Sequence, residues 1–359
     1  MTNKSKIVII DDSLLVRNIL SDVLGKKDGI EILATGKTGL DCIDLAEKLK
    51  PDFIILDIEM PVMDGLSALA EIKKKKLPSQ VIMLSVLTQH GADATFKALE
   101  LGAIDFVPKP STGNQFSPEQ ISDVLIQKIR GYMDSKGLGS FSSKLQQSPI
   151  LPAKDFLNKS FQKLVSVNAI AIGTSTGGPK ALQTIFTSLP KDLTKPIFVV
   201  QHMPPGFTKA FADRLNGLSQ ISVKEAEHGE MVEAGHAYIA PGDYQMRVIE
   251  KGGHKLIDLK QDPPVNGHRP SIEVTFDSVS QVYGANHLLS VIMTGMGKDG
   301  ANSITNIHKN GGVTLAQDEA SSVVYGMNRA AVELGGIDFV LPLEDIVPKM
   351  IDILRARGN

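Results

Sequence analysis

The chain has 359 residues with 38 basic and 40 acidic side chains, which gives a formal net charge of −2. This balance excludes a strongly basic nucleic-acid-binding surface, and the length predicts two domains. A single cysteine, Cys42, excludes an internal disulfide and is typical of a reducing cytoplasm. No apolar run reaches the ~20 residues that cross a bilayer, and residues 1–6 do not read as a signal peptide. We therefore expect a cytoplasmic protein without direct membrane insertion.

Residues 1–133 alternate between short apolar runs and segments with helical periodicity, which is typical of parallel βα units. Because the runs are apolar throughout, they indicate strands that are buried on both faces of a sheet. The predicted strands are Lys6–Ile10, Ile30–Ala34, Phe53–Leu56, Val81–Leu84 and Ile104–Val107. The last helix is expected at Ser117–Met133. This pattern predicts a flavodoxin-like α/β domain with a five-stranded parallel sheet.

Residues 134–164 are rich in Ser, Gly, Gln and Lys and have weak periodicity, so we interpret them as an interdomain linker. Residues 165–359 predict a second α/β domain, doubly wound around a mostly parallel sheet. Its predicted strands are Ala169–Ile172, Ile197–Gln201, Ala237–Ala240, Leu288–Met293 and Val313–Ala316. A small hairpin is expected to pair Gln245–Glu250 with Lys255–Leu259.

Three aspartates and a lysine follow predicted strands of the first domain. Asp11 and Asp12 follow the first strand, Asp57 the third and Lys109 the fifth. The carboxyl ends of parallel strands meet at one edge of the sheet, where ligands bind. Three crowded carboxylates need a cation, and a hard divalent ion such as Mg²⁺ suits them. Asp57 would then accept a phosphoryl group while Lys109 offsets its charge.

The first domain contains the motifs Asp11-Asp12, Asp57, Met60-Pro61-x-Met63-Asp64-Gly65, Ser85 and Lys109-Pro110. Each acidic residue alone would be an ordinary solvated loop residue, but the whole set is specific. Together these motifs resemble the receiver domain of two-component response regulators. The resemblance implies that a histidine kinase phosphorylates Asp57, that the three aspartates bind Mg²⁺, and that Ser85 and Phe106 transmit the signal.

The segment Gly173-Thr174-Ser175-Thr176-Gly177 lies between an apolar run and Pro179. It matches Gly-x-Ser-x-Gly, in which a strained turn between a strand and a helix exposes the serine hydroxyl. Pro179 is typical of the first turn of a helix. The motif alone is equally compatible with a phosphate-binding turn or a plain loop. Ser175 is therefore a candidate nucleophile that needs a neighbouring base.

Two further predicted strands of the second domain end near residues that would complete a serine triad. His202 follows Ile197–Gln201 and is the candidate base, although a histidine after a strand is more often structural. Asp299 lies in a glycine-rich loop and would orient the imidazole; its alternative role is an N-cap for a helix near Ala301. The order Ser…His…Asp differs from that of α/β-hydrolases, but triads are recognised by geometry. The competing histidines are His228, His236, His268 and His287.

The second domain also contains Ser175-Thr176-Gly177-Gly178-Pro179, Gln201-His202-Met203-Pro204-Pro205-Gly206-Phe207, Asn266-x-His268-Arg269-Pro270-Ser271 and Thr294-Gly295-Met296-Gly297-x-Asp299-Gly300. These motifs resemble the chemotaxis protein-glutamate methylesterase (CheB) family. Thr174 and Asn328 depart from it at positions where alanine and proline are common. The resemblance implies hydrolysis of glutamate methyl esters on the cytoplasmic helices of membrane chemoreceptors, and deamidation of glutamines there.

The same resemblance implies a role for each site residue. Ser175 would attack the side-chain carbonyl, His202 would take the serine proton, and Asp299 would hold the imidazole. Backbone N–H groups of Met296 and Thr176 would form the oxyanion hole. The esterase half needs no cofactor, and the chain lacks the His/Cys spacing of a zinc site. We expect the receiver to dock over the active site until Asp57 is phosphorylated.

Two alternatives remain at the level of the sequence. In the first, the receiver controls a nucleotide- or phosphate-binding module in which Gly173–Gly178 and Gly295–Gly300 cradle phosphates. Neither loop has the lysine of a P-loop, which weighs against this module. The second alternative, a DNA-binding response regulator, lacks a basic surface and a compact helix-turn-helix. Replacement of Ser175 by Ala separates an esterase from a binding module.

Overall fold

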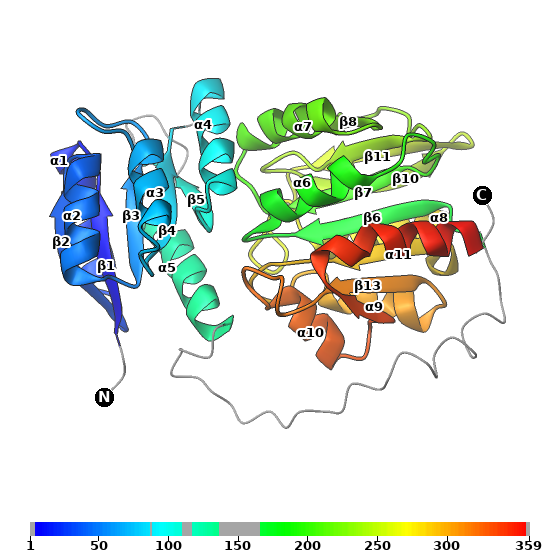
Figure 1. The fold of residues 1–359 in the computed structure, drawn as a ribbon. Helices are drawn as coiled ribbons and strands as arrows, with labels where there is room; N and C mark the ends of the chain where they lie inside the picture. Colours follow the sequence, from blue (N-terminus) through cyan, green and yellow to red (C-terminus); the bar gives the residue numbers. More distant parts are fainter. Residues whose placement is uncertain (1–3, 87, 110–116, 136–165, 357–359) are drawn as a thin grey trace.

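The computed structural model describes residues 4–86, 88–109, 117–135 and 166–356, which form two α/β units (Figure 1). Most of the expected linker 134–164 lies outside these residues, as does Pro110. We call the N-terminal unit the receiver unit and the C-terminal unit the catalytic unit.

The receiver unit has a parallel sheet with the strand order β2-β1-β3-β4-β5, which confirms the predicted five-stranded α/β fold. Its strands are β1 (Ser5–Ile10), β2 (Ile30–Gly36), β3 (Phe53–Asp57), β4 (Gln80–Ser85) and β5 (Asp105–Pro108). One face is covered by α1 (Leu14–Gly25) and α5 (Pro118–Ser135). The other face is covered by α2 (Gly39–Leu49), α3 (Gly65–Lys74) and α4 (Gln89–Glu100).

Strand β1 shows why the central strands contain continuous apolar runs, here Ile7–Ile10. Ile7 and Ile9 belong to the core between the sheet and α1 and α5, whereas Val8 and Ile10 belong to the core on the opposite face. Side chains of a strand alternate between faces, so a sheet with helices on both sides buries every position. The apolar run and the strand end together at Ile10, which places the next two residues, Asp11 and Asp12, at the edge of the sheet.

The catalytic unit has a seven-stranded parallel sheet with the order β14-β13-β12-β6-β7-β9-β8. The strands are β6 (Ala169–Thr174), β7 (Ile197–Gln201), β8 (Ser222–Glu225), β9 (His236–Ile239), β12 (Leu288–Ile292), β13 (Val313–Gln317) and β14 (Phe339–Leu341). The two strands that the sequence pattern misses, β8 and β14, are the edges of the sheet. Edge strands are partly exposed and therefore need no continuous apolar run.

Helices cover both faces of this sheet, as expected for a doubly wound fold (Figure 1). One face carries α6 (Gly178–Ser188), α7 (Phe207–Leu218) and α11 (Leu343–Ala356). The other carries α8 (Ile272–Tyr283), α9 (Ala301–Lys309), α10 (Met327–Glu333) and the antiparallel hairpin β10 (Gln245–Lys251) and β11 (His254–Lys260). A short 3₁₀ helix, η2 (Ala285–His287), precedes β12. Within the described ranges, no helix combines the length and apolarity needed to cross a membrane.

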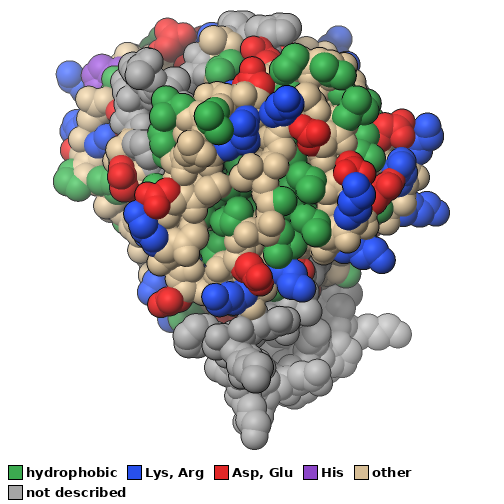
Figure 2. Space-filling model, turned by 90° about the vertical axis from the view of Figure 1, so that its left-hand side faces the viewer, with side chains coloured by type: hydrophobic (Ala, Val, Ile, Leu, Met, Phe, Trp, Pro, Cys, Tyr) green, Lys and Arg blue, Asp and Glu red, His purple; other side chains and the backbone are tan. Residues whose placement is uncertain are grey.

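The two units contact each other through the receiver's α4, β5 and α5. Two aromatic pairs bridge them, with ring centroids 5.3 Å apart for Phe96 and Phe211 and 4.6 Å apart for Phe106 and Phe207. Beside them, Glu100 contacts Arg214 in an ion pair and accepts a hydrogen bond from Gln183. In contrast, Figure 2 shows basic and acidic side chains interspersed on the face that the receiver turns away from the catalytic unit.

Candidate active site

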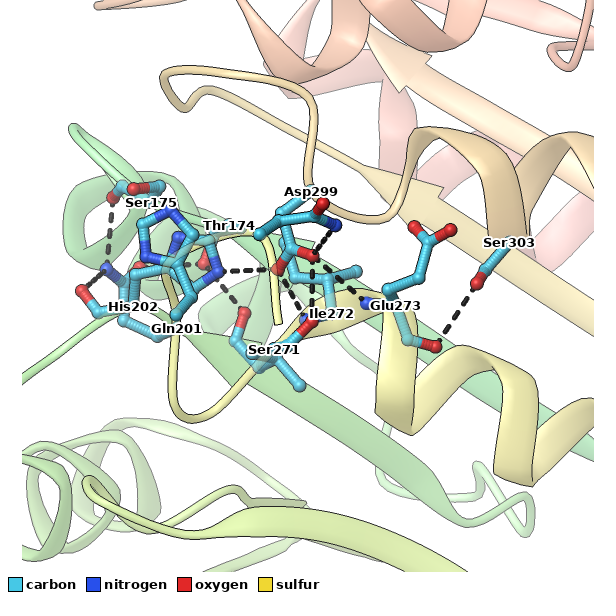
Figure 3. A network of polar contacts seen from close by, with 12 residues as sticks. Thr174, Ser175, Gln201, His202, Ser271, Ile272, Glu273, Asp299 and Ser303 are labelled. Atoms are coloured by element: carbon cyan, nitrogen blue, oxygen red, sulfur yellow. Dashed lines mark hydrogen bonds and ion pairs between the residues drawn. The ribbon is translucent and has the colours of Figure 1, made fainter. Parts of the chain in front are cut away.

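The three predicted triad residues meet because their strands are neighbours in the catalytic sheet. Strand β6 lies between β12 and β7, and all three run in parallel. Their carboxyl ends therefore lead to the same edge, where Ser175 follows β6, His202 follows β7, and Asp299 lies in the loop after β12. Figure 3 shows the three residues at this edge.

The turn after β6 is held from both sides. The Ser175 N–H donates to the carbonyl of Thr294 over 3.0 Å, and the Ser175 carbonyl accepts from Gly178 N over 2.8 Å. Gly177 has a φ of 80°, a left-handed conformation that favours glycine. Helix α6 begins at Gly178, so Pro179 occupies its first turn as the sequence predicted. The serine side chain is thus presented from a tight, well-supported turn.

Gln201 is a positioning group that was not predicted to have a role in the site. Its amide nitrogen donates to the carbonyls of Ser175 over 3.0 Å and His202 over 2.9 Å, while its oxygen accepts from Thr174 Oγ1 over 2.7 Å (Figure 3). A Cβ at Gly178 would overlap this amide oxygen. The available signal was a glutamine at the end of an otherwise apolar strand. Its buried amide ties the serine turn to the histidine backbone.

His202 binds Asp299 through one ring nitrogen only. The distance from Nε2 to Asp299 Oδ2 is 2.9 Å, whereas the buried Nδ1 has no hydrogen-bond partner among the described residues. An ionised Asp299 only accepts, so it selects the tautomer with the proton on Nε2. Nδ1 is then left with a lone pair. The ring is therefore equipped to take a proton at Nδ1, although no Ser175–His202 hydrogen bond joins the two described side chains.

Asp299 is ionised because many donors converge on it. Burial alone would favour the neutral acid, but hydrogen bonds from His202, Asn266 and Ser271 hold the pKa of Asp299 well below its usual range. The N–H of Ile272, the first residue of α8, adds a fourth donor at 2.7 Å. The alternative of an N-cap for the helix near Ala301 is wrong: Gly300 occupies that position, and the carboxylate serves the N-terminus of α8 instead.

His268, one of the competing histidines, packs directly on His202. The two rings are stacked, with centroids 3.6 Å apart and an interplanar angle of 11°. Burial, together with the neighbouring His202, lowers the pKa of His268 to about 3. His268 is therefore a neutral aromatic wall at neutral pH, and it limits how the His202 ring can turn. The sequence offered only its place within a longer motif as a signal.

The two predicted oxyanion donors lie on loops that are bound to each other. Thr294 Oγ1 donates to the carbonyl of Thr176 over 2.8 Å, and Gly295 N donates to Val324 O over 3.0 Å. The backbone N–H groups of Thr176 and Met296 have no acceptor within the part of the chain that the structure describes. Two unused N–H groups beside a serine are the arrangement that an oxyanion hole requires.

A cavity of about 220 Å³ adjoins Ser175, and both units line it. From the catalytic unit it includes Ser175, Thr176 and His202, and from the receiver unit Asp105 and Lys128. Thr176 Oγ1 donates to Asp105 Oδ2 over 2.6 Å, and Lys128 forms an ion pair with the same carboxylate. The receiver therefore reaches the residue next to the candidate nucleophile. The sequence predicted docking over the site but not these contacts.

At the receiver's own sheet edge, three acidic oxygens from Asp11, Asp12 and Asp57 lie within 4.8 Å of one another. Lys109 Nζ is 2.7 Å from Asp57 Oδ2 and 3.2 Å from Asp11 Oδ2. Burial, and then the charge of Asp11, raises the pKa of Asp57 to about 6, although Lys109 acts in the opposite direction. This donor set of carboxylate oxygens fits a hard divalent cation such as Mg²⁺.

Of the two predicted switch residues, Phe106 lies at the junction with the catalytic unit and Ser85 lies on the neighbouring strand. Ser85 Oγ donates to Gly91 O over 3.1 Å and accepts from Thr95 Oγ1 over 2.6 Å, so it is bonded to α4. It also lines a cavity of about 190 Å³ with Asp57 and Lys109. Phe106, on the neighbouring strand β5, is the ring that packs on Phe207 of the catalytic unit.

Comparisons with known proteins match both units of the chain. A family model described as CheB methylesterase matches residues 170–350, and one described as response regulator receiver domain matches residues 7–118. A protein-glutamate methylesterase/protein-glutamine glutaminase of Pyrococcus horikoshii is 43% identical, with 100% of this chain and 97% of the relative covered. The relative of that name from Clostridium acetobutylicum is 41% identical, with 98% of this chain and 99% of the relative covered.

Among solved structures, the catalytic domain of the Thermotoga maritima CheB methylesterase is similar at 42% identity and a TM-score of 0.51. The match covers 53% of this chain and 100% of that domain.

Proposed function

The chain belongs to the CheB methylesterase family, with a response regulator receiver domain ahead of the methylesterase domain, and from this premise we propose that it is a phosphorylation-activated serine esterase acting in chemotaxis. Its substrates are glutamate methyl esters, and glutamines, on the cytoplasmic helices of chemoreceptors. The relatives' names support both activities. Family membership overturns the alternative of a nucleotide- or phosphate-binding module.

In the proposed reaction, Ser175 Oγ attacks the side-chain carbonyl while His202 Nδ1 takes the hydroxyl proton. Asp299 stabilises the resulting imidazolium through Nε2. The N–H groups of Thr176 and Met296 donate to the developing oxyanion. His202 then returns the proton to the leaving methanol or ammonia, and water hydrolyses the acyl-serine by the same steps. The product is a glutamate carboxylate.

The receiver supplies the proposed control. Asp57 would take a phosphoryl group from a histidine kinase, and Lys109, 2.7 Å away, would offset the added charge. Mg²⁺, held by Asp11, Asp12 and Asp57, would neutralise charge on the transferring group. We propose the domain limits 1–133, 134–164 and 165–359 for the receiver, linker and esterase.

The contacts between the units support inhibition by the docked receiver. Asp105 accepts a hydrogen bond from the Thr176 hydroxyl, and Phe106, a predicted switch residue, packs on Phe207 at the start of α7. A helical receptor segment needs access to Ser175, which is 7% exposed in this docked arrangement. Phosphorylation of Asp57 would act through the neighbouring strands β4 and β5 and loosen this interface.

The observation that carries the proposal is the carboxylate-bound His202 beside the supported Ser175 turn. Methanol release from methylated chemoreceptor membranes tests it, with the wild type, Ser175→Ala and the control Ser188→Ala. Ser188 is an exposed helix residue whose hydroxyl bonds only the carbonyl of Thr184. We expect release from the wild type and the control but not from Ser175→Ala. Equal release by all three proteins would refute the serine mechanism.

A further inference from the structure

Helix α5 of the receiver forms one wall of the cavity beside Ser175. Val124, Gln127 and Lys128 of this helix line the cavity together with Ser175 and His202. The position of the wall is set by the contacts of its neighbours, because Lys128 is ion-paired with Asp105, whose carboxylate accepts from Thr176. A glutamine side chain is thus presented, from a helix, to the cavity of the candidate nucleophile.

Gly131 shows how closely this helix approaches the oxyanion loop. A Cβ at Gly131 would overlap Sδ and Cγ of Met296, so any other residue at this position would displace the Met296 side chain or the helix. Gln127 lies four residues earlier and therefore on the same face of the helix. The face that carries Gln127 is consequently the one turned toward Met296, whose N–H is a proposed oxyanion donor.

The Gln127 amide is available for reaction. Its side chain is exposed and lines the cavity, and among the described residues no side-chain hydrogen bond of Gln127 is found. Gln120 of the same helix differs, because its amide oxygen accepts from Ser117 N over 2.7 Å. The charged neighbour Lys128 is held by Asp105 in an ion pair. Gln127 therefore has the chemistry and the helical setting of the substrates of the proposed deamidase.

We propose that Gln127 is an internal substrate, which Ser175 deamidates while the receiver is docked. This inference rests on the proposed function and extends it to a modification site on the enzyme itself. The cavity of about 220 Å³ has room for several waters at ~30 Å³ each, so the hydrolytic step has its co-reactant. Docking thus keeps receptor helices away from Ser175 and at the same time places helix α5 of the receiver beside it.

The reaction balances in two steps. Ser175 Oγ forms a bond to Cδ of Gln127 and His202 takes the serine proton; the C–N bond then breaks, and the nitrogen leaves with that proton as ammonia. Water next adds to Cδ while His202 takes one of its protons. The Oγ–Cδ bond breaks, the proton returns to Ser175, and a glutamate carboxyl remains at position 127.

Peptide mass spectrometry of the full-length protein tests the proposal. Wild type and Ser175→Ala are incubated without phosphodonor, and the fragment that ends at Lys128 is followed over time. It contains Gln115, Gln120 and Gln127, so the converted residue is located by fragmenting the peptide, and Gln120 is an internal control. We expect Gln127, and not Gln120, to gain the mass of an amide-to-acid conversion in the wild type only. The rate should not depend on protein concentration, because the reaction is intramolecular.

Two outcomes overturn the inference: Gln127 stays an amide in the wild type, or it is lost equally from Ser175→Ala. Methanol release from methylated receptor membranes is then measured on the same preparations after a phosphodonor and Mg²⁺ are added. Normal release with an intact Gln127 refutes the internal substrate alone, whereas loss of both activities refutes the proposed function as well. Gly131→Leu, which pushes α5 away, should slow Gln127 conversion and raise receptor demethylation. An increase in both rates would contradict reaction from the docked state.

Discussion

Replacement of Asp299 by Asn tests how the carboxylate supports His202. Its Oδ2 accepts from His202 Nε2 and, over 2.7 Å, from Ile272 N. Its Oδ1 accepts from Asn266, Ser271 and, over 3.5 Å, from Glu273 N. A backbone N–H can only donate, and the short bond from Ile272 outweighs the long one from Glu273, whereas the Asn266 amide can turn and the Ser271 hydroxyl can accept. The new amide should therefore keep its oxygen on the Oδ2 side, and the tautomer of His202 is preserved.

The predicted loss is then that of the charge alone. A hydrogen bond to a charged group contributes about 1.5–3 kcal/mol and a neutral one about 0.5–1.5 kcal/mol. The imidazolium of the transition state thus loses about 1–2 kcal/mol, which corresponds to a ~5- to 30-fold lower kcat. Asp299→Ala instead leaves His202 Nε2–H and Ile272 N–H without an acceptor, at about 1–3 kcal/mol each. It should unfold more easily and lose kcat by roughly 10³-fold or more.

Methanol release kinetics and urea unfolding of the wild type and both variants provide the measurements. We expect Asp299→Asn to unfold almost like the wild type and to retain measurable kcat. If Asp299→Asn is as unstable and inactive as Asp299→Ala, the proposed amide orientation is wrong. If it retains full kcat, the charge of Asp299 does not stabilise the imidazolium.

Three further predictions concern the interface, the phosphoacceptor and the oxyanion loop. Gly131→Leu should raise methanol release by the unphosphorylated protein several-fold, because the new side chain pushes α5 away from Met296. Gly217→Leu should not, since nothing lies within 4 Å of a Cβ added there. Asp57→Asn should raise the unfolding free energy at neutral pH by about 1–3 kcal/mol without Mg²⁺. Because the pKa of Asp57 is raised to about 6 in the folded state, ionised Asp57 lowers the free energy of unfolding above about pH 6. Below the pKa of the unfolded chain, Asp57 is protonated in both states, so the gain from Asp57→Asn should vanish as the pH falls. Thr294→Val should lower kcat about tenfold at unchanged KM, and Thr294→Ser should restore it, because the hydroxyl binds the Thr176 carbonyl; an unchanged kcat would refute this.

Local patterns were enough to predict most of the architecture. Strands β1 and β6 contain the continuous apolar runs Ile7–Ile10 and Ala169–Ile172, and the residues that follow the two strands are the predicted site residues Asp11 and Ser175. Parallel order brings those ends together without any knowledge of side-chain contacts. The edge strand β8 was missed because half-exposed strands of mixed polarity resemble loops.

The contacts that complete the site could not be predicted from local pattern. Gln201 binds two carbonyls from different turns, and His268 comes to His202 from a distant loop. The hydrogen bond between Asp105 and Thr176 depends on how two separately folded units dock. Such pairings are non-local, since each residue type alone is equally at home on a solvated surface.

The most direct test of the account is methanol release from methylated chemoreceptor membranes by wild type and Asp57→Asn, each with and without a small phosphodonor and Mg²⁺. The account predicts low release from both proteins at rest, and a rise with phosphodonor in the wild type only. A wild type that ignores the phosphodonor, or an Asp57→Asn protein that responds to it, would contradict an esterase switched through Asp57.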